Sequence, residues 1–167
     1  ASDCFALVGV TRHPTKRDRV AVREIQEWHA EAGHQISYIG DDLSPGPEGH
    51  LIKLRKTHNI VCVCFDPYQL IDMSQRLEVQ EGLWFDQFGQ GTKRLEADRS
   101  LLSNIVSKVV AFDSSLAGSG TLWNHIDNAD RKVDDSGSKF RLVKGRGRID
   151  CAVGLSMASR QCLNLNL

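Results

Sequence analysis

The stretch Asn59-Ile60-Val61-Cys62-Val63-Cys64-Phe65-Asp66-Pro67-Tyr68-Gln69 decides the fold that we expect for this chain. Residues 60–65 are consecutively apolar, which is typical of a central strand in an α/β sheet, covered on both faces. Asp66 ends this strand, at the sheet edge where open α/β folds form their crevice, and a carboxylate there can hold a metal ion. Asp before Pro is also an ordinary helix start, and Asp66 taken alone favours this capping interpretation.

Length and composition predict one globular domain spanning residues 1–167. The chain is 41% hydrophobic and 25% charged, which excludes wholesale disorder and fibrous repeats. Lys plus Arg equals Asp plus Glu at 21 each, so any affinity for a polyanion must come from the distribution of charge. The five cysteines are odd in number and mostly lie in apolar runs, as expected of reduced intracellular thiols. No apolar run reaches the roughly 18 residues of a membrane span, and no signal peptide is visible, so we expect a soluble chain.

The first half of the chain reads as strands followed by a strand–helix–strand order. We expect a strand over Cys4 to Val10 and a half-exposed antiparallel strand over Val20 to Trp28, with a helix over Ala21 to Ala32 as the alternative. Further elements are expected at Gln35 to Ile39 (short strand or loop), Glu48 to His58 (helix), Tyr68 to Glu81 (helix ended by Gly82), Leu83 to Phe88 (parallel strand) and 90–92 (loop). This order implies parallel pairing through right-handed crossovers.

The second half is expected to be mainly helical, with one basic segment. Helices are predicted over Leu95 to Val110, Thr121 to Arg131 and Ile149 to Ala158, and a polar turn over Lys132 to Ser138. Between them lies the segment 139–148, which we call the basic segment. Its cations are Lys139, Arg141, Lys144, Arg146 and Arg148. We expect it to form a β-hairpin arm or loop.

A second carboxylate, Asp150, follows the basic segment in the first turn of the last predicted helix. A favourable interaction with the helix dipole would explain it as well as a metal would. The neighbouring cations favour the metal, because they can hold phosphates beside a carboxylate that holds Mg²⁺ or Mn²⁺. Gly145 and Gly147 would let the backbone approach a polyanion closely. We therefore expect nuclease chemistry and DNA binding by the basic segment.

At these residues the sequence resembles the nuclease domain of tailed-phage terminase large subunits, the motors that package and cut viral DNA. The resemblance is carried by residues 64–69, 88–91, 122–129, 141–144, 148–153 and 157–158, in that order. It implies an α/β fold of the ribonuclease H-like type, a mixed β-sheet flanked by helices. It also implies an acidic cluster that binds two divalent ions, Mg²⁺ or Mn²⁺, to which Asp66 and Asp150 would be matched.

The resemblance leaves the third aspartate open. The family's first metal-binding aspartate lies on the first strand, ahead of a second aspartate that Asp3 matches better. The first strand and its aspartate are then expected upstream of residue 1, with Asp3 a neighbour of the site. If Val20 to Trp28 is instead the second strand, Asp3 is the third catalytic ligand. The motor's ATPase domain is absent from this sequence, which contains no phosphate loop.

The leading hypothesis is thus an endonuclease that cuts double-stranded, concatemeric viral DNA during packaging by two-metal hydrolysis. The resemblance implies other terminase subunits and the portal as partners, no membrane, and the host cell cytoplasm as location. The alternative is a nuclease-like DNA-binding or assembly module with an incomplete acidic site. A small-molecule α/β binding protein is less favoured because a glycine-rich loop is missing. The six histidines are expected to be surface or capping residues rather than catalysts.

Overall fold

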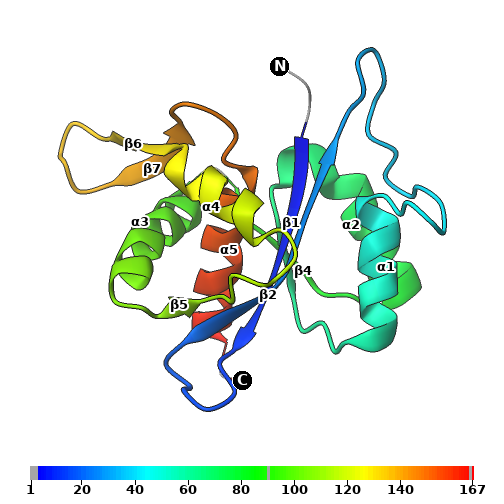
Figure 1. The fold of residues 1–167 in the computed structure, drawn as a ribbon, viewed down its shortest axis with the longest axis horizontal. Helices are drawn as coiled ribbons and strands as arrows, with labels where there is room; N and C mark the ends of the chain where they lie inside the picture. Colours follow the sequence, from blue (N-terminus) through cyan, green and yellow to red (C-terminus); the bar gives the residue numbers. More distant parts are fainter. Residues whose placement is uncertain (1–3, 90, 166) are drawn as a thin grey trace. The chain divides into compact units, whose positions relative to one another are not determined.

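Two neighbouring strands open the chain in the computed structural model, which describes residues 4–89, 91–165 and 167. Strand β1 (Cys4–Arg12) lies beside β2 (Val20–His29), and the start of β2 pairs parallel with β5 (Val110–Ala111). Figure 1 shows β1 and β2 running in opposite directions, so the sheet is mixed. Both predicted strands are confirmed, and the alternative helix over Ala21 to Ala32 is wrong. The segment 35–39 is a loop.

The apolar stretch ahead of Asp66 forms a shorter strand than predicted. Strand β3 (Val63–Phe65) pairs parallel with β4 (Phe85–Gln87), which confirms the predicted parallel pairing. Residues 60–62 lie outside the strand and Val61 is 40% exposed, so the expectation of a six-residue strand covered on both faces is wrong. The reason is that β4 offers only three partners, and the ladder ends with them.

Helices α1 (Pro47–Thr57) and α2 (Pro67–Glu81) begin and end where the sequence signals predict. Both have Pro in the first turn, and α2 ends at Gly82, whose φ of 65° is the left-handed conformation that glycine adopts easily. The two helices are joined by Glu48, a buried carboxylate that accepts a hydrogen bond from Arg76 at 2.7 Å. This bond and the charge of Glu48 raise the pKa of Arg76.

Helix α3 (Thr92–Val106) is displaced toward the N-terminus relative to the predicted helix, Leu95 to Val110. Lys108 has a φ of 57°, a conformation that a helix does not continue through. Val110 therefore lies in β5 instead of the helix. The spacing of apolar residues in the sequence does not reveal this break, because the valines after Lys108 fit a strand as well as a helix.

Helix α4 (Ser119–Asp127) also ends earlier than predicted, and the following residues form β6 (Ala129–Val133). Strand β6 pairs antiparallel with β7 (Phe140–Lys144). The basic segment therefore supplies one strand of a hairpin and the loop after it, and the other strand comes from residues that were not predicted to be a strand. The predicted turn over Lys132 to Ser138 is correspondingly shorter, because Lys132 and Val133 belong to the ladder. Figure 1 shows this hairpin extending beside α3 and α4.

The last helix, α5 (Asp150–Asn164), begins one residue after the predicted start and continues beyond Ala158. It packs against α3 and α4, and α3 also packs against β7. Its buried side is mainly apolar, and Ser156 and Ser159 are buried there as well. The buried apolar residues of α5 are Cys151, Ala152, Leu155, Met157 and Cys162.

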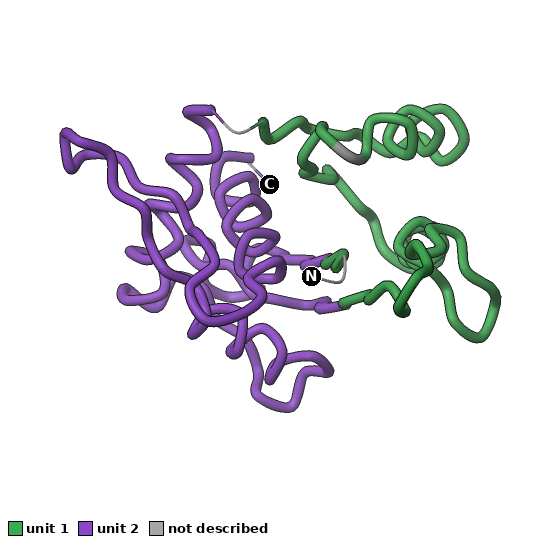
Figure 2. The backbone as a smooth tube through the Cα atoms, turned by 90° about the horizontal axis from the view of Figure 1, so that it is seen from above, with its two compact units in different colours: residues 1–6, 27–89 green, residues 7–26, 90–167 purple. Residues whose placement is uncertain are grey.

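Contacts divide the chain into two compact units, coloured separately in Figure 2. The first unit comprises residues 1–6 and 27–89, and the second comprises residues 7–26 and 90–167. The described residues contain five helices and seven strands, which confirms the mixed α/β class. The single-domain organisation stays a prediction. Within the described part of the chain, no helix is both long and apolar enough to span a membrane.

Candidate functional site

Asp66 lies at the carboxyl end of β3, as predicted, and caps α2. Its Oδ1 accepts a hydrogen bond from the backbone N–H of Tyr68 at 3.1 Å, and the side chain is half-buried. The capping interpretation is therefore confirmed. It does not exclude a metal, because an ionised carboxylate has about four lone-pair sites and the cap uses one.

Asp150 is the first residue of α5 in the second unit. Its Oδ2 is buried and has no hydrogen-bond partner among the residues that the structure describes. A buried acceptor without a partner is destabilising by about 1–3 kcal/mol, and more for a charged group. An oxygen in this position is suited to bind a cation.

His125 fixes the backbone turn that carries Asp150. The imidazole is 4% exposed, and its Nδ1 accepts a hydrogen bond from the N–H of Cys151 at 2.9 Å. His125 is therefore a capping residue, one of the two roles expected of the histidines, and it is buried. An accepting Nδ1 requires that the proton of the neutral ring is on Nε2.

The aspartates predicted to form the acidic cluster lie in different parts of the chain. Asp66 belongs to the first unit and Asp150 to the second, and Asp3 lies outside the described residues. The three-aspartate cluster and its metal ions therefore stay a prediction.

The basic segment is built around the β6–β7 hairpin in the second unit. Arg141 and Lys144 lie on β7, Lys139 precedes that strand, and Arg146 and Arg148 follow it. Register places Lys132 of β6 directly opposite Arg141. Side chains opposite each other share a face of the ladder, and like charges in this arrangement are destabilising unless an anion lies between them. The sequence does not identify Lys132 as part of the basic hairpin, because it lies in the segment predicted to be a turn.

Two glycines after β7 allow a close approach to Asn128, which lies between α4 and β6. Gly145 donates its N–H to the carbonyl oxygen of Asn128 at 3.0 Å, and the Asn128 side chain donates to the carbonyl of Arg148 at 3.2 Å. A Cβ on Gly147 would lie 2.6 Å from Asn128 Nδ2. The glycines were predicted to admit a polyanion. The structure gives them a packing role, which ties the residues before Asp150 to the hairpin.

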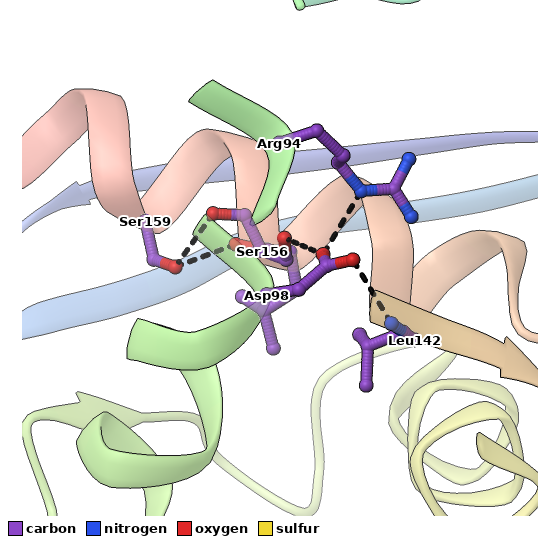
Figure 3. Close-up of polar contacts among 6 residues, drawn as sticks. Arg94, Asp98, Leu142, Ser156 and Ser159 are labelled. Atoms are coloured by element: carbon purple, nitrogen blue, oxygen red, sulfur yellow. Dashed lines mark hydrogen bonds and ion pairs between the residues drawn. The ribbon is translucent and has the colours of Figure 1, made fainter. Parts of the chain in front are cut away.

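Asp98 on α3 is the centre of a buried polar network that holds β7 and α5 (Figure 3). Its Oδ1 accepts from Arg94 Nε at 2.9 Å and from Ser156 Oγ at 2.6 Å, and its Oδ2 accepts from the N–H of Leu142 at 3.0 Å. Asp98 is fully buried and Arg94 is 5% exposed. The network attaches the basic hairpin to the helix that begins with Asp150.

Sequence reasoning missed Asp98, Arg94, His125 and Asn128. Arg94 and Asp98 have the i, i+4 spacing of an ordinary surface ion pair. Nothing in the adjacent sequence therefore indicates that this pair is buried. The partners of the other two, Cys151 and Gly145, are 26 and 17 positions away along the sequence.

The fold of this chain is similar to that of solved structures of phage proteins. No protein-family model and no curated protein matches the sequence. Among solved structures, the large terminase of bacteriophage HK97 matches with a TM-score of 0.70 and 16% identity over 95% of this chain. The chain spans 39% of the length of that protein.

Two isolated nuclease domains match as well. The Thermus phage P74-26 large terminase nuclease domain aligns with a TM-score of 0.56 and 17% identity, over 95% of this chain and 80% of that one. The magnesium-bound large terminase nuclease from thermophilic phage G20c aligns with a TM-score of 0.54 and 16% identity, over 95% and 82%. These matches confirm the predicted resemblance at the level of structure: the chain has the fold of phage large terminase nuclease domains.

Proposed function

We propose that the chain is a divalent-metal-dependent endonuclease that cuts double-stranded DNA, the nuclease domain of a phage-type terminase large subunit. The fold supports this proposal, and one neighbour of that fold is a nuclease with bound magnesium. The observation that carries it in this chain is Asp150 Oδ2, a buried carboxylate oxygen with no hydrogen-bond partner among the described residues. Two positions before Asp150 the basic segment ends with Arg148, so a metal ligand and a phosphate-binding cation share one short stretch.

The residues present fit a hard divalent cation. Asp66 and Asp150 would hold Mg²⁺ or Mn²⁺ through carboxylate oxygens, and Asp3 is the proposed third ligand; such ions bind oxygen ligands and tolerate retained water. When bound, two such ions would supply a water of lowered pKa and neutralise the charge on the leaving oxygen.

The protein's own groups would position the DNA. Lys139, Arg141, Lys144, Arg146 and Arg148 would contact the phosphates, and Lys132 adds a cation opposite Arg141. Phosphate contacts fix the duplex without reading its bases, so cutting is expected to have little sequence preference. Asp98 and His125 would keep the hairpin and the first turn of α5 in place, through their bonds to Leu142 and Cys151.

The biological setting follows from the same proposal. The substrate would be concatemeric viral DNA in the host cell cytoplasm, cut during packaging. The partners would be other terminase subunits and the portal.

Cleavage of supercoiled plasmid in Mg²⁺ or Mn²⁺ tests the proposal. We expect nicked and linear products with metal and none with a chelator. Asp66→Asn and Asp150→Asn should each remove cleavage, and Asp18→Asn, an exposed carboxylate in the loop after β1, should cleave like the wild type. DNA binding without any cutting by the wild type would identify the alternative, a nuclease-like binding or assembly module.

A further inference from the structure

Three side chains of the first unit, Cys4, Glu27 and His29, form a cluster of potential metal ligands, which we call the Cys–Glu–His cluster. One ligand atom from each residue lies within 4.8 Å of the other two. The Cys4 thiol donates to Glu27 Oε1 at 2.9 Å, and His29 Nε2 lies 3.0 Å from Glu27 Oε2. The carboxylate thus lies between the sulfur and the imidazole.

The pairing of β1 with β2 explains why these residues meet. Glu27 and His29 are two positions apart on β2 and therefore project from one face of the strand. Cys4 is the first residue of β1, the neighbouring strand. The cluster therefore lies where the hairpin opens, at the ends of its two strands.

The strand residues next to the ligands, Phe5 and Trp28, are well packed. Phe5 and Trp28 stack edge to face with ring centroids 5.8 Å apart, and Trp28 Nε1 donates to the carbonyl of Pro45 at 2.9 Å. The ring contact and the hydrogen bond hold the backbone of both strands in place. The three ligand side chains therefore start from an ordered backbone, which lowers the entropy cost of arranging them around an ion.

The donor set selects a particular class of cation. Thiolate and imidazole are ligands of zinc and similar transition-metal ions, whereas Mg²⁺ prefers oxygen. Zinc sites with three protein ligands hold the ion about 2.0–2.3 Å from nitrogen, oxygen and sulfur atoms and leave one position for water. Atoms already within 4.8 Å of one another need only small side-chain rotations to reach such distances.

We propose that the Cys–Glu–His cluster is a binding site for Zn²⁺ or a related transition-metal ion, separate in chemistry from the carboxylate site proposed for the nuclease reaction. Access is available, because the His29 side chain is 41% exposed while that of Glu27 is 15% exposed. Binding replaces the hydrogen bond between Cys4 and Glu27 with coordination of both groups, and the thiol proton is released to solvent. The ion would join the first strand to the second at their open end.

Titration with Co²⁺, which reports thiolate coordination through a sulfur-to-cobalt charge-transfer band, tests this site. The wild-type chain is expected to bind one equivalent with this band, and Zn²⁺ should remove the band by displacing cobalt. Cys4→Ser should abolish the band. Glu27→Gln and His29→Gln should weaken binding at least about tenfold, because even an outer-shell partner of a metal ligand contributes that much.

Two controls keep this result distinct from the proposed nuclease site. Asp66→Asn and Asp150→Asn should leave the sulfur-to-cobalt charge-transfer band unchanged, because neither residue supplies a thiolate. His34→Gln, which alters an exposed histidine in the loop after β2, should also leave the band unchanged. Absence of a charge-transfer band in the wild type, or its persistence in Cys4→Ser, would overturn the proposal. Plasmid cleavage by the same proteins is scored separately, so failure of either proposal is recognised independently.

Discussion

The Nδ1 atom of His125 accepts a hydrogen bond from the backbone N–H of Cys151 at 2.9 Å. This bond places a buried histidine of α4 at the first turn of α5, one residue after Asp150. The N–H groups of a first helical turn have no partner within the helix, so a side chain from elsewhere must satisfy them if they are buried. His125 provides that partner, and it thereby connects the position of Asp150 to the packing of α4.

Replacing His125 with Ala should therefore loosen the start of α5. The lost acceptor leaves a buried N–H unsatisfied, which is destabilising by about 1–3 kcal/mol. Hydrogen exchange at the Cys151 amide measures the effect directly, and exchange should accelerate. His125→Asn, whose side-chain oxygen can take the place of Nδ1, should restore part of the protection. Equal protection in the wild type and His125→Ala would contradict this role.

The buried network around Asp98 predicts a larger effect. Asp98→Ala leaves Arg94 as an uncompensated buried charge and removes the acceptor for Leu142 N–H and Ser156 Oγ. Breaking a buried pair in this way costs about 3–5 kcal/mol. Urea denaturation followed by a probe in α5 measures the loss.

A matched control is available between the same two helices. Glu96 on α3 accepts from Arg160 on α5 at 2.6 Å, and the Glu96 side chain is 54% exposed. Glu96→Gln should lower stability by no more than about 1 kcal/mol, because solvent screens an exposed pair. Similar losses for Asp98→Ala and Glu96→Gln would show that the buried network does not hold the two helices together.

The turn of the basic hairpin should be sensitive to acid. Asp134 accepts from the N–H of Lys139 at 3.0 Å and from Ser136 Oγ at 2.7 Å, and these bonds lower its pKa below the ordinary 3.8. A carboxyl whose pKa is lower in the folded state stabilises the turn above its unfolded pKa, and the stabilisation is lost as pH falls through the folded value.

Hydrogen exchange of the hairpin amides across acidic pH should therefore show protection falling below about pH 4. In Asp134→Asn this pH dependence should be absent. An identical pH profile in the variant would mean that another group controls the turn.

The basic segment predicts a salt effect on DNA affinity. Each phosphate contact that is lost should flatten the slope of log affinity against log salt by about 0.9, so neutralising Lys144, Arg146 and Arg148 together should flatten it by roughly two to three units. Unrelated DNA sequences should show the same loss. The double variant Lys16→Gln, Lys56→Gln removes exposed cations elsewhere and should keep the wild-type slope. An unchanged slope in the triple variant would make the basic segment an ordinary solvated loop.

Local signals account for the parts of the fold that were predicted. Asp66-Pro67 and Gly82 set the ends of α2 to within a residue, and alternation identified β2. Strand β3 was predicted too long, because an apolar run does not reveal how short its partner strand is. Ala129 to Val133 was divided between a helix and a turn, since only pairing with residues 140–144 makes it a strand.

The sequence predicted only those site residues whose signal lies in residues adjacent to them along the chain. Asp66 and Asp150 stand at element ends that the sequence marks, and the cations of the basic segment are contiguous. Asp98 and His125 are polar residues inside helical patterns, and nothing local distinguishes them from exposed ones. Their burial comes from packing against α5, which begins 25 or more positions further along the chain. The Cys–Glu–His cluster likewise requires knowledge of which strand β1 pairs with.

We propose that Asp66 and Asp150 both bind the divalent ions of a nuclease. Anomalous diffraction from crystals grown with Mn²⁺ tests it most directly, because manganese positions are located independently of the protein. We expect manganese bound by both carboxylates, with two ions about 3.5–4 Å apart. Manganese bound only by other residues, or Asp66 and Asp150 side chains directed to opposite faces of the protein, would contradict it.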